Sequence, residues 1–417
     1  DVPELSYDFQ APIREYGQIS ETAKELKLLS MFVHDYGEAF CDMQPQFVGD
    51  DCESTSVHTG DFQDAEDLSA FRMITRRSGD HGYLFVNNYQ RGYEMAAHKD
   101  VMLRVQTADG KISFPKQDIK NGAYFFYPFN FPLSDDVTLR WINQTPLCNI
   151  NQKLWFFYGI DKMQYEADEK LSGQVLISMD RTWAKCAWRM KKYPNILFFS
   201  ALPILETENG IEVICRSDHA QKNCWIIMDA TVEDAKTWID NGWKKPDIIP
   251  DFLHVEGDAS TICVLSHELS AADNQIVASF THTDVNNCII LKEKTDFSME
   301  EACAIDDTGK DYREYVIRIS YDKAYDAVKD NIFLRIDFQA DQAELYLNGE
   351  KIADQYYIGD VWEVSLKRFD FPTELILRLY PLEEDDKIYL ETQPDYLNGR
   401  CCSLKDIRCV YECKEKL

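Results

Sequence analysis

The sequence predicts a mainly β protein assembled from sandwiches or barrels, and three observations lead to this prediction. Aromatic residues make up 13% of the chain, which suits pleated, half-buried strands better than helical bundles. Short runs of alternating apolar and polar residues recur along most of its length. Turn signals stand between these runs, as is typical of sandwiches and barrels. Two segments differ from this β pattern: one amphipathic helix near the N-terminus and a shorter helical pattern at residues 231–241.

The first 45 residues are predicted to hold one strand or loop, at residues 5–9, and one amphipathic helix. Ser20 is placed to cap a helix over residues 24–36, and Gly37 stands just past its end, where glycine commonly stops a helix. Four apolar residues recur at helical spacing and predict its buried stripe: Leu26, Leu29, Val33 and Tyr36. A strand followed by one helix is half of a βα unit, which needs neighbouring units to close a core.

Beyond residue 45 the pattern is that of β-hairpins. Turn signals occur at Asp109-Gly110, Asn209-Gly210 and Asn348-Gly349, because glycine adopts the positive φ that such turns require. The predicted strands include residues 83–86, 101–107, 111–114, 124–127, 137–141, 206–215, 343–347, 351–353, 375–379 and 387–391. A charged stretch between residues 290 and 312 marks a second boundary. The predicted domains are therefore a βα segment at 1–45, one or two sandwiches at 46–300, and a further β domain at 301–417.

The charge balance excludes several classes of partner. The chain has 44 Lys and Arg against 72 Asp and Glu, so phosphate backbones and anionic membrane surfaces should repel it. No apolar run approaches the roughly 20 residues that span a bilayer. The 13 cysteines at irregular spacing favour a reducing compartment, and we expect a cytoplasmic protein. The start at Asp1-Val2-Pro3 lacks an initiator Met and suggests a trimmed chain.

Motifs that carry catalytic or metal chemistry are not recognisable. Glu94 and His98 stand four residues apart near His81, but no second ligand pair has zinc spacing, so we predict no metal and no cofactor. Nucleophile-elbow and glycine-rich phosphate-loop patterns do not occur. The spacing of the acidic residues marks no pair as the two carboxylates of a glycosidase.

Aromatic side chains near the C-terminus are the candidates for carbohydrate binding. Tyr356, Tyr357 and Trp362 can stack on sugar rings, and Trp362 follows the turn-forming pair Gly359-Asp360. Such residues more often fill the core of a sandwich, so both interpretations stay open.

Three sets of residues resemble the β-galactosidases of glycoside hydrolase family 35. Residues 6–17, SYDFQAPIREYG, resemble the segment that closes the catalytic barrel of that family, and the helix ending at residues 34–37 fits the same place. Residues 82–91, followed by 98–101, are similar to a β-domain downstream of that barrel. Residues 334–390 resemble the galactose-binding-like jelly roll of the same enzymes, and the three matches occur in the order of the family.

The resemblance implies a parent enzyme that removes terminal β-linked galactose with retention. The family's two catalytic glutamates precede the segment at residues 6–17, so we expect a C-terminal portion that contains no catalytic residue. Tyr7 and Asp8 match residues near the galactose site, and Phe9 stands where the family usually has tyrosine.

The implied partners are a galactoside, an N-terminal barrel absent from this chain, and a second copy in a homo-oligomer; we expect no nucleic acid and no membrane. Two alternatives remain. One is a stand-alone carbohydrate-binding module, and the other is a structural or oligomerisation module that binds no sugar.

Overall fold

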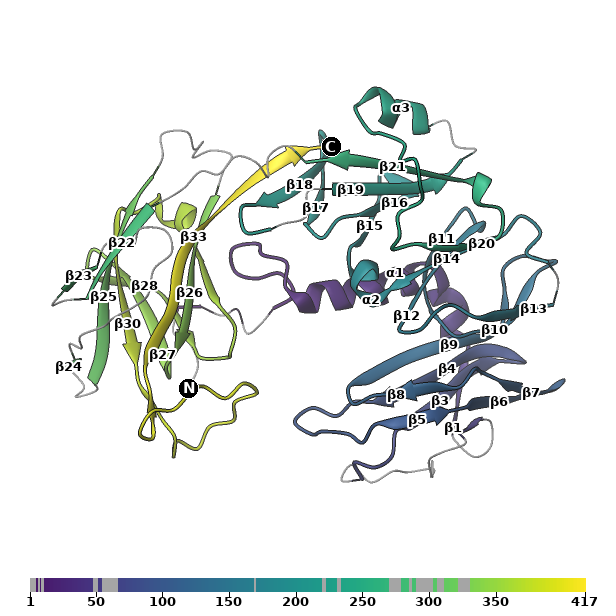
Figure 1. Ribbon diagram of the computed structural model, residues 1–417, viewed down its shortest axis with the longest axis horizontal. Coiled ribbons are helices and arrows are strands. Elements are labelled where there is room, and N and C mark those ends of the chain that lie inside the picture. The colour runs from purple at the N-terminus through teal and green to yellow at the C-terminus, as the bar shows by residue number, and fades with distance from the viewer. Residues whose placement is uncertain are drawn as a thin grey trace. The chain divides into compact units, whose positions relative to one another are not determined.

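The computed structural model has 53% of its residues in strands and 12% in helices, which confirms the mainly β prediction. It describes residues 5–6, 8, 11–47, 52–54, 67–168, 170–219, 223–230, 234–269, 279–284, 287–289, 303–305, 311–321 and 331–417. Residue contacts divide the chain into two units that are not contiguous in sequence (Figure 1). Unit 1 is Asp1–Ala23, Leu202–Lys222 and Leu269–Leu417, and unit 2 is Lys24–Ala201 and Asn223–Glu268.

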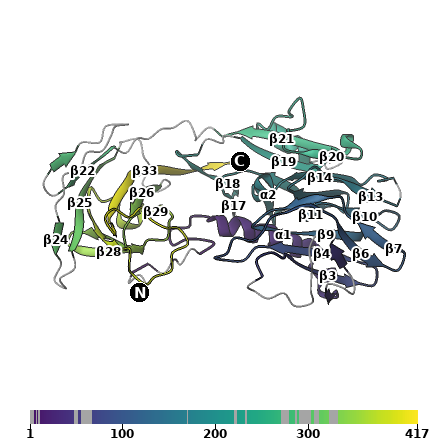
Figure 2. The same cartoon turned by 60° about the horizontal axis from the view of Figure 1, so that its bottom comes forward.

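Unit 1 has two sheets that share one core, as in a β-sandwich (Figure 2). One sheet has the order β17 (Ile204–Thr207), β18 (Gly210–Arg216), β33 (Ser403–Lys416), β26 (Asn331–Gln339) and β29 (Trp362–Ser365). The other has the order β23 (Asn287–Ile289), β22 (Ser279–Asp284), β25 (Asp311–Ser320), β30 (Glu374–Tyr380), β27 (Gln342–Leu347) and β28 (Glu350–Tyr356). Three shorter strands and one 3-10 turn complete the unit: β24 (Cys303–Ile305), β31 (Leu382–Glu383), β32 (Arg400–Cys401) and η3 (Leu366–Phe369).

The core of unit 1 follows from the period-two alternation of its strands. Alternate residues of β25, β26 and β30 point inward and are almost fully buried: Tyr315, Ile317, Ile319, Ile332, Leu334, Ile336, Leu375, Leu377 and Leu379. Because each buried side chain of this size contributes about 1.5–3 kcal/mol relative to exposure, this face holds the two sheets together.

Unit 2 contains several smaller sheets. The largest has the order β1 (Gln44–Phe47), β3 (Arg72–Ser78), β4 (His81–Asn88), β9 (Ala123–Pro132), β10 (Thr138–Ile142) and β13 (Tyr165–Ala167). Small pairings lie beside it: β2 (Cys52–Ser54) with β6 (Leu103–Thr107) and β7 (Gly110–Ser113), and β5 (His98–Val101) with β8 (Gln117–Ile119).

Two four-stranded sheets follow in unit 2. One has the order β11 (Thr145–Ile150), β12 (Leu154–Gly159), β14 (Val175–Asp180) and β20 (His254–Glu256), and its β12–β14 pair is parallel. The other has the order β15 (Ala187–Met190), β16 (Tyr193–Phe199), β19 (Asn223–Asp229) and β21 (Ile262–Glu268). The helical segments here are α2 (Arg181–Lys185), α3 (Asp234–Asp240) and η1 (Ala259–Thr261), and α3 confirms the helix predicted near residues 231–241.

The helix α1 (Glu21–Cys41) differs from its prediction in length and in its buried face. It continues through Gly37, because a glycine costs a helix only about 1 kcal/mol and Phe40 beyond it packs on Tyr83 at 6.0 Å between ring centroids. The predicted stripe was wrong except for Tyr36: its other members, Leu26, Leu29 and Val33, are 47%, 54% and 49% exposed. The residues that α1 buries instead are Leu28, Met31 and Phe32. Two apolar stripes were present, and packing against the sheets of unit 2 selects the one that contains Phe32.

The three predicted hairpins are confirmed. Thr107 pairs with Gly110, Thr207 with Gly210, and Leu347 with Glu350. The strand predicted at residues 387–391 is wrong, since this segment is irregular and its Ile388 and Tyr389 are 50% and 70% exposed. Alternation alone was insufficient there, because none of the strands that the structure describes pairs with the segment.

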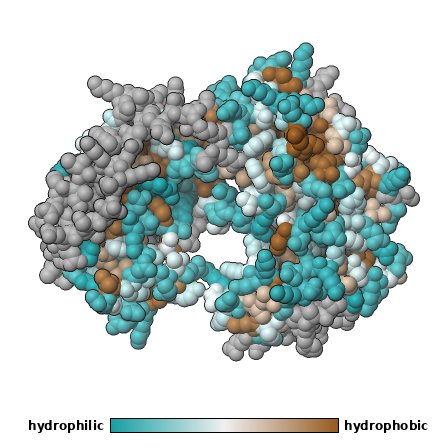
Figure 3. Space-filling view, viewed as in Figure 1, coloured by the Kyte–Doolittle hydropathy of each residue, from teal (hydrophilic) through white to brown (hydrophobic). Residues whose placement is uncertain are grey.

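Hydrophilic residues dominate the visible surface, with smaller apolar patches between them (Figure 3). This agrees with the net charge of −28. No helix in the described part of the chain is both long enough and apolar enough to cross a membrane.

Candidate functional site

The segment at residues 5–20 is fixed to the sandwich of unit 1 by one buried carboxylate. Asp354 on β28 is fully buried, and its Oδ1 accepts hydrogen bonds from the backbone N–H of Leu5 at 3.0 Å and of Ser6 at 3.1 Å. A buried charge is tolerated only where hydrogen bonds replace its hydration. Asp354 therefore holds this segment at a defined position on the sandwich.

Residues 11–20 form a tight loop. The Arg14 N–H donates to the Gln18 carbonyl at 2.9 Å, and the Tyr16 N–H donates to the Gln18 side chain at 3.0 Å. Gly17 at the tip has a φ of +86°, which explains a glycine at this position. Tyr16 packs against the core of unit 1, and burial raises the pKa of its hydroxyl, with a further rise from the Glu15 carboxylate.

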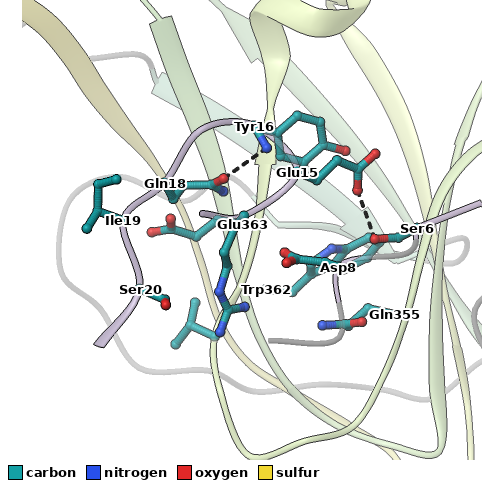
Figure 4. Close-up of a pocket in the computed structure, with 12 residues that line it drawn as sticks. Ser6, Asp8, Glu15, Tyr16, Gln18, Ile19, Ser20, Gln355, Trp362 and Glu363 are labelled. Atoms are coloured by element: carbon teal, nitrogen blue, oxygen red, sulfur yellow. Dashed lines mark hydrogen bonds between the residues drawn. The ribbon is translucent and has the colours of Figure 1, made fainter. Parts of the chain in front are cut away.

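A pocket of about 110 Å³ lies between this loop and the sandwich (Figure 4). The loop supplies polar side chains, among them Ser6, Asp8, Arg14 and Glu15, and the β28–β29 region supplies Gln355, Val361, Trp362 and Glu363. Two hydrogen bonds order its rim: the Ser6 hydroxyl donates to Glu15 Oε2 at 2.8 Å, and Arg14 pairs with Asp360 at 3.2 Å.

Asp8 is the lining residue whose hydrogen bonding is incomplete. Its Oδ1 is buried, yet it has no hydrogen-bond partner among the residues that the structure describes. Leaving such an oxygen unsatisfied costs about 1–3 kcal/mol, and more when the group is charged. In Figure 4 the Asp8 carboxylate lies among the side chains that line the pocket, so a ligand hydroxyl donated to Oδ1 would remove this cost.

The aromatic candidates are divided between the pocket and the core. Trp362 lines the pocket but is only 6% exposed, and its ring packs on Phe338 at 6.4 Å. Tyr357 is 7% exposed and contacts the same phenylalanine at 6.3 Å. Tyr356 is partly exposed but does not line the pocket. The pocket therefore offers a ligand only a small part of the Trp362 side chain rather than an open aromatic platform.

The fold brings together two residues that sequence reasoning named separately, Asp8 and Trp362. Tyr7 and Phe9 lie outside the described residues. The reasoning missed Glu15 and Gln355, which also line the pocket. Glu15 belongs to the segment that carried the family resemblance, so that segment could have suggested it, whereas Gln355 has no signal in the sequence.

The chemistry of the pocket is hydrogen bonding at close range. Carboxylates of Asp8, Glu15 and Glu363 accept hydrogen bonds, whereas Arg14 donates and Gln355 does both. Glu363 is already held by Arg216 at 2.6 Å. Such a mixture suits a small polyhydroxyl group, whose hydroxyls donate and accept. Within the described ranges, no cluster of His, Cys, Asp and Glu is arranged to hold a metal ion.

Comparison with protein-family models and with curated proteins finds no match to this chain.

Proposed function

We propose that this chain is a non-catalytic, C-terminal portion of a β-galactosidase of glycoside hydrolase family 35, and that the pocket around Asp8 contacts carbohydrate. The parent enzyme hydrolyses terminal β-D-galactosides with retention. In this proposal residues 1–45 correspond to the last βα segment of the catalytic barrel, and unit 1 contains the galactose-binding-like jelly roll. The ordered sequence resemblance supports the assignment to the family.

One observation carries the carbohydrate contact: the buried Oδ1 of Asp8 lacks a partner among the described residues, inside a polar pocket edged by Trp362. Sugar hydroxyls can donate hydrogen bonds to such a carboxylate, and the small exposed part of the Trp362 side chain adds apolar contact. The charge balance of 44 basic to 72 acidic residues supports a neutral ligand over a polyanion.

The test is calorimetry of the chain with galactose and lactose at millimolar concentration. We expect measurable heat for the unaltered chain, a clearly smaller heat in Asp8→Ala, and no change in Asp135→Ala, which removes an exposed aspartate of unit 2. Absence of heat with both sugars would refute the carbohydrate contact. Turnover of an aryl β-galactoside that survives stringent purification would refute the non-catalytic assignment.

A structural or oligomerisation module is the second candidate, and the exposed stripe of α1 favours it. Leu26, Leu29 and Val33 lie on one side of the helix and are each about half exposed. Sedimentation across a wide concentration range, repeated after changing all three to glutamine, tests this function. A chain that stays monomeric at every concentration argues against it.

We further propose that the protein works in the cytoplasm. Ten of the cysteines, all in the described part of the chain, are not joined in disulfides, which supports a reducing compartment. A fluorescent fusion that accumulates outside the cytoplasm would contradict this.

A further inference from the structure

A larger depression lies in unit 1, away from the residues that line the Asp8 pocket. Its volume is about 700 Å³, within the range of roughly 300–1,000 Å³ that is usual for small-ligand sites. One wall is the start of β25, with Asp311 and Tyr312, and the other is the loop that leads into β32 and β33, with Asp395, Tyr396 and Arg400. We call this depression the β25–β33 groove.

Of the three cations that line the groove, Arg313, Arg400 and Lys405, the last two are paired with carboxylates. Arg400 is bound by Asp311 on one side, and on the other its Nε lies 2.9 Å from Glu383 Oε1. Lys405 pairs with Asp395 at 3.2 Å. Because Arg400 and Lys405 already have carboxylate partners, a phosphate or another anion that binds them would have to displace those carboxylates. The groove instead presents donors and acceptors side by side, which is the pattern that neutral hydroxyl groups can bridge.

Two tyrosines add aromatic surface to the groove. Tyr312 is fixed from behind, since the Arg378 guanidinium lies 4.6 Å from its ring centroid and the Tyr380 ring lies at 5.7 Å. Tyr396 is partly exposed and lines the opposite wall. Aromatic rings of this kind pack against the C–H faces of sugar rings and give apolar contact beside the polar groups.

The wall that carries Tyr396 is already ordered. Leu397 and Arg400 exchange backbone hydrogen bonds across a turn, at 2.9 and 3.3 Å. Asn398 and Gly399 form this turn with φ values of +55° and +80°. The Asp395 N–H donates to the Gln339 side chain at 3.1 Å, which ties the loop to β26. Binding would therefore incur little cost for ordering the loop.

From these observations we infer that the β25–β33 groove is a second carbohydrate site, which binds a neutral saccharide between Tyr312 and Tyr396. It has the same ligand class as the proposed function but uses different residues. Arg400, Asp311 and Asp395 bond the hydroxyls of the saccharide, and the two tyrosines contact its rings. Through this groove the chain would bind a glycan even when the Asp8 pocket is empty.

The test separates the two sites by working in an Asp8→Ala background, which leaves the groove unaltered. Lactose, galactose and inorganic phosphate are titrated by calorimetry into this variant, and into the same variant carrying Tyr396→Ala or Tyr389→Ala. Tyr389 is the matched control, because it is 70% exposed in the same connection and does not line the groove. Thermal unfolding of each variant verifies that it is folded.

We expect saccharide binding in the Asp8→Ala chain, an affinity about tenfold lower with Tyr396→Ala, and no change with Tyr389→Ala. The inference is overturned if Tyr396→Ala binds saccharide as the background does, if phosphate competes with saccharide, or if Asp8→Ala alone abolishes all binding. The last result would leave the proposed function of the Asp8 pocket intact. Binding that Asp8→Ala leaves unchanged and Tyr396→Ala removes would support the groove and refute the Asp8 pocket.

Discussion

Replacing Glu412 by glutamine should stabilise unit 1 at neutral pH. Glu412 lies on β33, opposite Arg216 of β18, in a partly buried position. Burial raises the pKa of its carboxyl from the ordinary 4.5 to about 6, and Glu363 adds to the rise, whereas Arg216 and Lys414 oppose it. Arg216 gives limited compensation, because its guanidinium is already bonded to Glu363 at 2.6 Å and to Asp218 at 3.2 Å.

The magnitude follows from proton linkage. A carboxyl whose pKa is raised by folding binds its proton more tightly in the folded state, so stability falls as pH rises through the window from 4.5 to about 6. One pKa unit corresponds to about 1.4 kcal/mol, so the whole rise corresponds to a penalty of about 2 kcal/mol at pH 7. Glutamine keeps the shape of the side chain and removes the charge. Its advantage should therefore be near 2 kcal/mol above pH 6 and should vanish below about pH 4.5.

The assay is urea unfolding of Glu412→Gln and the unaltered chain at several pH values from 4.5 to 8, with hydrogen exchange of peptides from β33 to localise the effect to unit 1. Glu350→Gln is the control, because Glu350 is an exposed glutamate at the start of β28. The difference in free energy of unfolding between Glu350→Gln and the unaltered chain should not change between pH 4.5 and pH 8. A destabilising Glu412→Gln at pH 8, or a gain that does not change with pH, would refute the linkage reasoning.

Three further predictions follow from single contacts. Asp35→Ala should cost about 3–5 kcal/mol in the thermal unfolding of unit 2, because the buried Asp35 carboxylate is bonded to Arg189, whose charge would lose its partner; a loss below 1 kcal/mol would contradict this. Gly82→Ala should destabilise the β3–β4 pair by at least 1–3 kcal/mol in the same assay, since an added Cβ would lie 2.2 Å from a backbone carbonyl oxygen. Cys215 lies opposite Cys413 in the β18–β33 register, so glutathione disulfide should oxidise the two thiols to one disulfide and be reduced to two glutathione thiols. Peptide mapping would detect the cross-link, and its persistence in Cys413→Ser would disprove the pairing.

The sequence predicted correctly the features that a few neighbouring residues determine, such as hairpin turns. The Asn209-Gly210 hairpin was predicted correctly because two residues specify its turn. The partner of this hairpin was not predictable. Its second strand, β18, pairs with β33 about 200 residues later in the sequence, with Cys215 opposite Cys413. The sequence of neither strand indicates that the two strands pair with each other. The same limit applies to α1, where two apolar stripes competed and only packing against distant strands selected one.

The candidate site shows this limit at the level of function. Asp8 and Trp362 were each singled out, one by resemblance and the other by its aromatic side chain. They share a pocket because contacts such as that of Asp354 with Leu5 and Ser6 fix the segment on the sandwich. That carboxylate is fully buried and lies on the strand next to the pocket. The position of Asp8 therefore depends on the folding of unit 1, and a weakened Asp354 contact should disturb the pocket before it unfolds the sheet. The segment that most resembles the end of a catalytic barrel is thus held by the sandwich, which gives the sandwich a direct part in shaping the site proposed for the sugar.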